Sequence, residues 1–401
     1  MRIYPASSEE ALRARKLLTE WTADGYLSKE QQQALEEETA TDLRTTNIFL
    51  RLVLFVFTVI AVAAAVGLFF AIFLSRASQP ATGFLLLIFA AVSYTAAEVL
   101  AEKGWYRHGI EEALAACSVG FLCSGLEMLF FSSVRASHEA QWIVSAVGAV
   151  VSLWIWRRFH LWYAFPAAMI FANYLPGFWT SSQAVQHLFV ALLYVAGLVV
   201  FAPVRARHRF DYLEGAYSLA EAFLWLGLYL ILNLQISQLG LMSLVGSPGM
   251  PGRLHQGSAG LFYWTTWVLI WCLPPLILAR GVRLKDRLIL AAGALTTILT
   301  FISNKPYLGW PRHTWDPMLL GVALAGVAIY LRRWLAQGPD GVRHGFTAAR
   351  LSDRDRHAMS VGSSFLGLIT PHSVTPAPQP AQPEVQFGGG RSGGGGASGD
   401  Y

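Results

Sequence analysis

Long apolar runs fill the middle of the chain and are separated by short polar stretches. Ten such segments lie at residues 52–74, 82–101, 112–132, 141–156, 160–179, 184–203, 215–235, 259–279, 287–303 and 316–335. Because about 20 consecutive apolar residues cross a bilayer as a helix, the pattern predicts an all-α, polytopic helical membrane protein with about ten transmembrane helices. The fourth and ninth segments are the shortest, so whether they span completely stays open here.

The first 47 residues are polar and predict two short helices joined by a turn. The first helix runs from about Ser7 to Ala23, and Gly25 follows at a position where glycine readily closes a helix. Ser28 and Gln31 form the capping box that opens the second helix. We expect a solvated cytoplasmic helical hairpin at residues 1–47; a docking surface for a protein partner is the alternative.

The last part of the chain, residues 336–401, is rich in proline and glycine. Such a composition buries too little apolar surface to offset the entropy lost on folding, so it predicts a disordered cytoplasmic tail. The tail is a second place where a protein partner would bind. The predicted organisation is therefore a hairpin at 1–47, a transmembrane helical domain at 48–335 and a tail at 336–401.

Composition and charge narrow the class of partner. Hydrophobic residues make up 54% of the chain and charged residues 14%, with a formal net charge of +5. A soluble domain carries about 25% charged residues. The excess arginines lie beside the apolar segments and form no basic cluster interleaved with exposed aromatic residues. We therefore expect a lipid bilayer as partner and no nucleic acid.

The loops between the apolar segments predict the orientation, because Lys and Arg are retained in the cytoplasm. With the amino terminus inside, the four inner loops contain eleven Lys and Arg residues and the five outer loops contain five. This bias predicts an even number of spans with both termini in the cytoplasm. The amino-terminal residues lack the apolar core and cleavage site of a signal peptide, so the first span is expected to direct insertion.

No enzyme or cofactor motif is present. The sequence contains no GxxxxGK[ST], HExxH or repeated CxxC, and the GxGxxG match at Gly388 lies in the tail without the flanking strand and helix that a dinucleotide site needs. The three cysteines lie within apolar segments, and the ten histidines lack ligand spacing. We expect no enzymatic activity, no cofactor and no metal site.

Three glutamates within the predicted spans are the candidate proton or ion sites. Glu98 and Glu221 lie in the inner halves of the second and seventh spans, and Glu127 lies in the outer half of the third. A charged side chain at a helix centre costs about 2.5 to 3.5 kcal/mol on insertion scales. Each carboxylate is therefore expected to be protonated, to have a partner, or to face a watered cavity.

Asn173, His187 and Asn233 lie near the outer side and are candidate supporting polar residues. In one interpretation the acids and these residues line an aqueous path that relays protons. In the other, the acids near span ends reach the interface and the rest hydrogen-bond to neighbouring helices. The second arrangement is the more common one in membrane proteins, where such contacts contribute about 0.6 to 2 kcal/mol each.

A short motif before the first span resembles the amino-terminal signature of a bacterial membrane-protein family. Residues 21–31 read WTADGYLSKEQ. They match the pattern W-x-x-x-G-x-[IL]-[ST]-x-E-Q at Trp21, Gly25, Leu27, Ser28, Glu30 and Gln31. This pattern is similar to that of the family called domain of unknown function 2157. The resemblance covers about the first third of the chain and implies a bacterial inner-membrane location, but the family has no assigned activity.

Two functional hypotheses follow from these patterns. The first is an uncharacterised transporter or permease of the bacterial cytoplasmic (inner) membrane, with Glu98, Glu127 and Glu221 as sites for an unidentified small-molecule or ion substrate. The alternative is a membrane-anchored scaffold or sensor that recruits partners through its cytoplasmic ends. A lipid-modifying enzyme is a weaker third idea, because no His, Asp and Arg group clusters at one face.

Overall fold

The computed structural model describes most of the chain. The described residues are 2–23, 25–73, 78–130, 134–208, 211–236, 260–310, 313–338, 342–343 and 346–347. The chain divides into two compact units, Met1–Leu320 and Gly321–Tyr401. Most of the predicted disordered tail lies outside the described residues.

The amino-terminal hairpin forms as two short helices, α1 (Ala6–Ala23) and α2 (Lys29–Glu38). The capping box is confirmed: Ser28 Oγ accepts the backbone N–H of Gln31 at 3.2 Å, and Gln31 Oε1 accepts that of Ser28 at 2.9 Å. Arg15 of α1 donates to the backbone carbonyl of Glu36 at 2.9 Å, which ties the two helices together.

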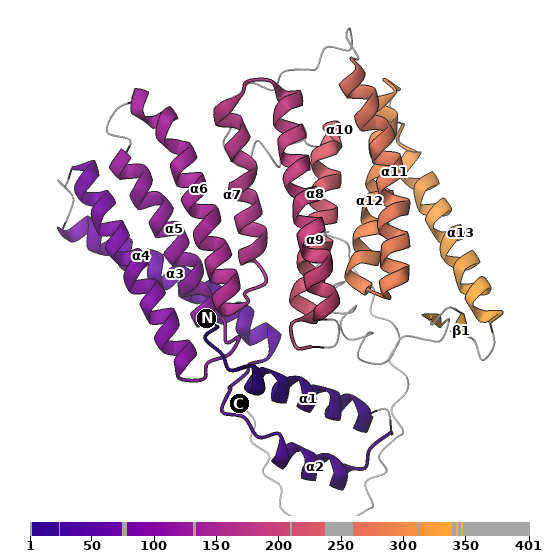
Figure 1. Cartoon of the computed structure of the whole chain (residues 1–401), viewed down its shortest axis with the longest axis horizontal. Coiled ribbons are helices and arrows are strands. Elements are labelled where there is room, and N and C mark those ends of the chain that lie inside the picture. Colours follow the sequence, from indigo (N-terminus) through magenta and orange to yellow (C-terminus); the bar gives the residue numbers. More distant parts are fainter. Residues whose placement is uncertain are drawn as a thin grey trace, which may run out of the picture. The chain divides into compact units, whose positions relative to one another are not determined.

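Helices also form each of the ten apolar segments (Figure 1). Their bounds are α3 (Ile48–Phe73), α4 (Gln79–Glu102), α5 (Ile110–Phe130), α6 (Val134–Phe159), α7 (Ala164–Trp179), α8 (Gln183–Arg207), α9 (Glu214–Leu232), α11 (Leu261–Leu284), α12 (Arg287–Tyr307) and α13 (Asp316–Ala336). A single-turn helix, α10 (Leu234–Ile236), follows α9. In the described part of the second unit, β1 (Val342–Arg343) pairs antiparallel with β2 (Phe346–Thr347). Apart from these two-residue strands, the described elements are helices, so the all-α prediction is confirmed.

Nine of the described helices are long and apolar enough to cross a membrane: α3, α4, α5, α6 from Gln141, α8, α9, α11, α12 and α13. The fourth and ninth segments are among them, with 19 and 21 residues. The shortest of the ten helices is α7, with 16 residues. Its length is about 24 Å at the helical rise. Its late start follows from His160, which adopts a φ of 53° directly after α6 and interrupts the helical path.

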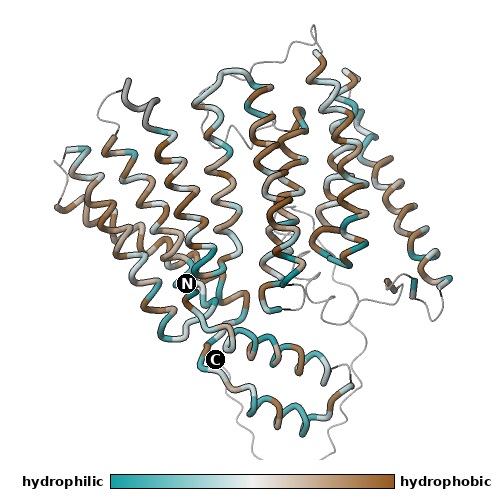
Figure 2. Tube along the Cα trace, in the orientation of Figure 1, coloured by the Kyte–Doolittle hydropathy of each residue, from teal (hydrophilic) through white to brown (hydrophobic). Residues whose placement is uncertain are grey.

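The long helices present apolar side chains outward. In α3 only 6% of the most apolar stretch is buried, and Phe57, Ile60 and Leu68 are exposed on it. Figure 2 shows apolar residues along most of the length of these helices and polar residues near their ends and on α1 and α2. A surface of this kind suits contact with lipid rather than with water.

Two buried clusters hold the helices of residues 1–320 together. One gathers Ala97, Ala115, Ile155 and other residues from α4, α5 and α6. The other involves α7, α8, α9, α11 and α12, and Tyr194, Tyr229 and Ile277 are among its fully buried members. Trp156 near the end of α6 packs against both clusters. The packing therefore forms two helix groups, α3–α6 and α8–α12, with α7 packed on α6, α8 and α9.

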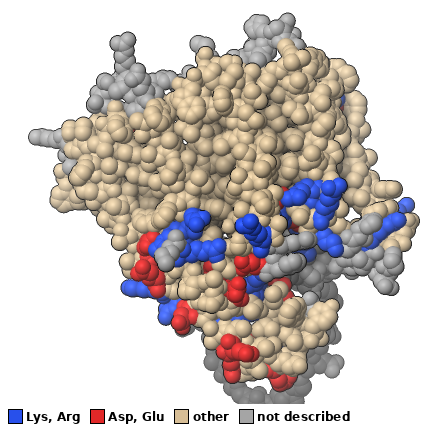
Figure 3. All heavy atoms as spheres, viewed as in Figure 1, with Lys and Arg blue, Asp and Glu red and all other residues tan. Residues whose placement is uncertain are grey.

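Charged side chains gather at one end of these helices, which we call the charged end; the opposite end is the far end. On the face shown in Figure 3, Lys, Arg, Asp and Glu lie at this end and on the helices beside it. The amino-terminal segment is attached here, since the Tyr4 hydroxyl donates to the Trp105 carbonyl at 2.8 Å and the Ile3 N–H to the Arg158 carbonyl at 3.2 Å.

Two glycines allow α4 and α5 to pack at close range. A Cβ atom on Gly125 would lie 2.9 Å from the Gly83 carbonyl oxygen, and one on Gly83 would lie 2.8 Å from the Gly125 carbonyl oxygen. Both distances are backbone contacts that a side chain cannot relieve by rotating. The helices therefore approach each other through small residues, as is typical of membrane helix pairs.

This contact leads to a prediction with an internal control. We expect Gly125→Ala to lower the unfolding free energy by about 1 to 3 kcal/mol, since the added methyl forces α4 and α5 apart. Gly120 lies on the same helix with nothing within 4 Å of its added Cβ, so Gly120→Ala should be neutral or stabilise by up to about 1 kcal/mol. Thermal unfolding of the two variants in detergent checks this; equal melting temperatures would count against the close contact.

Candidate functional site

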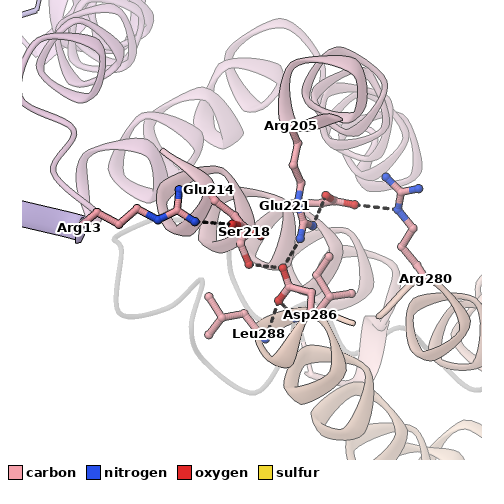
Figure 4. A network of polar contacts seen from close by, with 9 residues as sticks. Arg13, Arg205, Glu214, Ser218, Glu221, Arg280, Asp286 and Leu288 are labelled. Carbon is pink, nitrogen blue, oxygen red and sulfur yellow. Dashed lines mark hydrogen bonds and ion pairs between the residues drawn. The ribbon is translucent and has the colours of Figure 1, made fainter. Parts of the chain in front are cut away.

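Four helices of the second group bring charged side chains together at the charged end (Figure 4). Arg205 lies in the last turn of α8 and donates through Nη1 to Glu221 Oε2 of α9 at 2.5 Å. Its Nη2 donates to Asp286 Oδ2, which also accepts the Ser218 hydroxyl of α9. Arg280 of α11 donates through Nε to Glu221 Oε1 at 3.0 Å. We call these five residues the arginine–carboxylate network.

The network is largely buried, with Arg280 as its most exposed side chain, and its formal charges cancel. Glu221 is 2% exposed and Arg205 is 6% exposed. Two arginines face two carboxylates, and both oxygens of Glu221 have a guanidinium partner. Buried charges in such a place cost several kcal/mol each unless they are paired and hydrogen-bonded. The pairing explains how Glu221 is accommodated inside an apolar helix bundle.

Asp286 serves both the network and the local fold. It caps α12, where its Oδ1 accepts the backbone N–H groups of Leu288 at 2.8 Å and Ile289 at 3.2 Å. Burial acts to raise the pKa of Asp286, but the Ser218 hydrogen bond, the Arg205 charge and the two backbone N–H groups outweigh it and hold the pKa below its ordinary value. Asp286 is therefore ionised at neutral pH and fixes the position of Arg205.

Helix α1 contributes further charged residues at the charged end. Arg13 contacts Glu214 in the first turn of α9 at 3.4 Å, and both side chains are partly exposed. One turn earlier on α1, Glu9 is buried and its pKa is raised by burial, with a hydrogen bond to Tyr106 and the charge of Arg107 opposing the shift. One helix thus contacts the loop after α4 and the start of α9, which belong to different helix groups.

A polar cluster lies at the other end of α9, where the helix stops. Asn233 is fully buried and donates to the Tyr229 hydroxyl at 2.9 Å and to Ser303 Oγ at 2.8 Å. The Tyr229 and Thr300 hydroxyls are 2.8 Å apart. The Tyr307 hydroxyl accepts the backbone N–H of Leu234 at 2.7 Å, just after the break. We call Tyr229, Asn233, Thr300, Ser303 and Tyr307 the Asn233 cluster.

The network and the cluster lie on one face of α9. Ser218, Glu221, Trp225, Tyr229 and Asn233 follow at spacings of three or four residues, which places them in one row along the helix. The row is about 22 Å long at the helical rise. At its middle, Trp225 Nε1 is buried and has no hydrogen-bond partner among the described residues. We call these five positions the polar row.

The three sequence-predicted glutamates lie in three different surroundings. Glu221 belongs to the arginine–carboxylate network. Glu98 on α4 accepts Arg158 Nε at 2.8 Å and Nη2 at 3.0 Å, and the Tyr94 hydroxyl at 2.7 Å. Glu127 is exposed on α5 and forms no ion pair with the other described residues. The structure therefore does not bring the three carboxylates into one site.

The predicted supporting residues are also spread over several contacts. Asn173 donates to the Tyr194 hydroxyl at 3.1 Å, between α7 and α8. His187 Nδ1 lies 2.8 Å from the Ile231 carbonyl oxygen, between α8 and α9. Asn233 forms the centre of the cluster described above. Of the six predicted residues, Glu221 and Asn233 share the polar row.

Several residues of these sites were not predicted as such. In the sequence, Arg205 and Arg280 counted only as loop charges that set orientation, and Asp286 and Thr300 had no assigned role. Two signals point to them in retrospect. Asp286 directly precedes an apolar helix, as an N-cap does, and Thr296, Thr300 and Ser303 recur at helical spacing on an otherwise apolar span.

Comparison with protein-family models, curated proteins and solved structures gives no match for this chain. The resemblance of residues 21–31 to the family called domain of unknown function 2157 stays a prediction. Within the part of the chain that the structure describes, no three His, Cys, Asp or Glu residues are grouped so that they would hold a metal ion. The geometry of the polar row is thus the basis for the functional argument.

Proposed function

We propose that the chain is a multi-pass protein of the bacterial cytoplasmic membrane and acts as a permease for protons or small cations. The observation that carries this proposal is the polar row on α9, in which Glu221 and Asn233 are both buried. An ionisable residue within a membrane helix is costly, and such residues commonly mark ion or proton pathways. The charged end faces the cytoplasm in this proposal, in agreement with the bias of loop arginines.

Glu221 is the proton carrier in this proposal. Arg205 holds one oxygen of the carboxylate and Arg280 holds the other, so the path is closed at the charged end in this proposal. When Glu221 takes up a proton, its attraction for both arginines falls, and the carboxyl group is released toward Trp225 and Tyr229. Hydroxyl groups of the Asn233 cluster, which both donate and accept, then continue the path.

Proton flux in liposomes tests this function. Purified chain is reconstituted with an enclosed pH-sensitive dye, and a membrane potential is imposed with potassium and valinomycin. We expect the wild-type chain to acidify the lumen well above the rate of empty liposomes. Glu221→Gln should lower acidification to the rate of empty liposomes, because an amide does not take up and release a proton near neutral pH. Glu102→Gln is the matched control, since Glu102 is exposed at the end of α4.

Each outcome of this experiment bears on the proposal. Wild-type flux with an inactive Glu221→Gln variant and an active Glu102→Gln variant supports it. Equal flux in the wild type and in Glu221→Gln would remove Glu221 as the carrier. Wild-type flux no faster than that of empty liposomes would contradict the proposal that the chain conducts protons.

A scaffold role is the second candidate, and α2 is the observation that favours it. No residue of α2 is buried, and Glu37 and Glu38 are exposed on it. Such an acidic helix at the charged end is available to a basic partner protein. Under this alternative, Glu37→Lys with Glu38→Lys abolishes partner capture from the cytoplasm, whereas Glu221→Gln leaves the capture unchanged.

A further inference from the structure

A cavity of about 160 Å³ lies at the charged end, apart from the polar row. Its lining comes from three separate parts of the chain: the amino-terminal segment (Arg2), the end of α6 and the residue after it (Trp156, Arg157 and His160), and the first turns of α9 (Tyr217). A single water needs about 10 to 15 Å³ of such volume. The cavity is therefore large enough for a group of several heavy atoms.

The lining is positively charged. Arg2 and Arg157 form no ion pair with the other described residues, and Arg2 lies over the Tyr212 ring with its Cζ at 5.3 Å from the centroid. Two acids lie near Arg2. Asp211 is already bound by His208 at 2.9 Å, and Glu9 interacts with the charge of Arg2 without forming an ion pair among the described residues. Two guanidinium groups with unused donors thus face a space that lacks a paired carboxylate.

The buried side chain of His160 is a second, independent feature of this cavity. Its side chain is 8% exposed, and neither ring nitrogen has a hydrogen-bond partner among the described residues. Burial, together with the charges of Arg2, Arg107 and Arg157, lowers the pKa of His160 to about 4. The ring is therefore neutral at pH 7, with one N–H to donate and one nitrogen to accept. Buried polar groups are almost always satisfied, so an unpaired imidazole in a cavity wall points to a ligand that binds there.

We propose that this cavity binds a phosphate group, held by Arg2 and Arg157 and by an N–H of His160. Guanidinium groups match phosphate oxygens with paired N–H donors, and a third donor from another direction suits a tetrahedral anion better than a planar carboxylate. The phosphate belongs either to a lipid headgroup at the level of the charged end or to a free phosphate compound. This inference is independent of the proton permease proposed above.

A phosphate bound in this cavity should stabilise the fold, because the cavity lies where three parts of the chain meet. Trp156 packs against both buried clusters, and the Tyr217 ring stacks on His208 with centroids 5.4 Å apart. A phosphate in the cavity therefore contacts the end of α6, the start of α9 and the amino-terminal segment together. Because the ligand binds only the folded arrangement, it should raise the melting temperature of the chain.

The experiment measures binding to the full-length chain in a neutral detergent by calorimetry. One arm titrates inorganic phosphate, and the other titrates a short-chain phosphatidic acid. Arg157→Gln and His160→Gly are the test variants. His160 has a φ of 53°, a conformation that glycine adopts without strain, so His160→Gly removes the ring while preserving the turn. We expect each variant to weaken binding at least tenfold.

Two control variants separate this site from general effects. Arg283→Gln removes an exposed arginine from the last turn of α11. Lys285→Gly relieves the same backbone conformation, a φ of 54°, away from the cavity. Both should bind like the wild type. Binding in the phosphate arm identifies a free phosphate compound, and binding in the lipid arm alone identifies a headgroup. Absence of binding in both arms, or unchanged affinity in Arg157→Gln and His160→Gly, would overturn the proposal.

Discussion

Replacing Arg205 by glutamine is expected to lower the unfolding free energy by about 3 to 5 kcal/mol. The substitution leaves Glu221 with Arg280 alone and leaves Asp286 without its guanidinium partner, although both carboxylates stay buried. A buried charge that loses its partner is more costly than a neutral pair in the same place. Thermal unfolding in detergent measures the effect.

A matched control and a rescue variant make this prediction specific. Arg207 lies two residues later on α8 and is exposed, so Arg207→Gln makes the same chemical change without a buried partner and should have an effect below about 1 kcal/mol. Adding Glu221→Gln to Arg205→Gln removes one of the stranded charges and should restore part of the loss. If Arg205→Gln melted at the wild-type temperature, the network would not be a buried ion-pair system.

The second large effect is expected from Asn233→Leu. Leucine has a similar size but cannot donate to the Tyr229 and Ser303 hydroxyls or accept the Ile236 N–H, which Asn233 Oδ1 does at 3.3 Å. Each buried polar group left without a partner costs about 1 to 3 kcal/mol. The Tyr229 and Ser303 hydroxyls keep other contacts in the cluster, so we expect a total of about 2 to 4 kcal/mol.

Asn173→Leu is the control for this variant. Asn173 donates one described hydrogen bond, to the Tyr194 hydroxyl at 3.1 Å, so its loss should be about half as large or less. Chemical denaturation of both variants in mixed micelles would show the difference. Equal losses, or a larger loss for Asn173→Leu, would mean that the Asn233 cluster does not stabilise the break between α9 and α10.

The helices were largely predictable because their signals are local. Apolar runs of about 20 residues leave little choice but a helix, and the capping box at Ser28 fixes the start of α2. The ends were less predictable. Hydropathy marks only the apolar part of α6, which begins earlier, at Val134, and α7 begins later than its apolar run because of the backbone conformation at His160.

The site was predictable only in part because its contacts are distant in sequence. A glutamate in an apolar span indicates that a partner exists, and Glu221 and Glu98 both have one. The identity of the partner depends on helix packing: Arg158 is 60 residues from Glu98, and Asp286 is 81 residues from Arg205. Loop arginines have a simpler explanation in topology, so no sequence pattern assigns them to buried pairs.

The topology depends on whether the short helix α7 crosses the bilayer. If it crosses the bilayer, the chain has ten crossings and both termini share one side. If it does not, the helices after it reverse their direction relative to those before it. At about 24 Å it is shorter than a typical hydrocarbon core of about 30 Å, although the bilayer can thin locally around a short span.

Labelling of single cysteines from either side of the membrane tests the central claim most directly, which is that the helices cross a bilayer with the charged end in the cytoplasm. In a background without Cys117, Cys123 and Cys272, a membrane-impermeant thiol reagent is applied to spheroplasts and to inverted vesicles carrying Thr19→Cys, at the exposed surface of α1, or Ser181→Cys, exposed between α7 and α8. The account predicts that Thr19→Cys reacts only in inverted vesicles and Ser181→Cys only in spheroplasts. Reaction of both positions from the same side, or recovery of the chain in the soluble fraction, would contradict it.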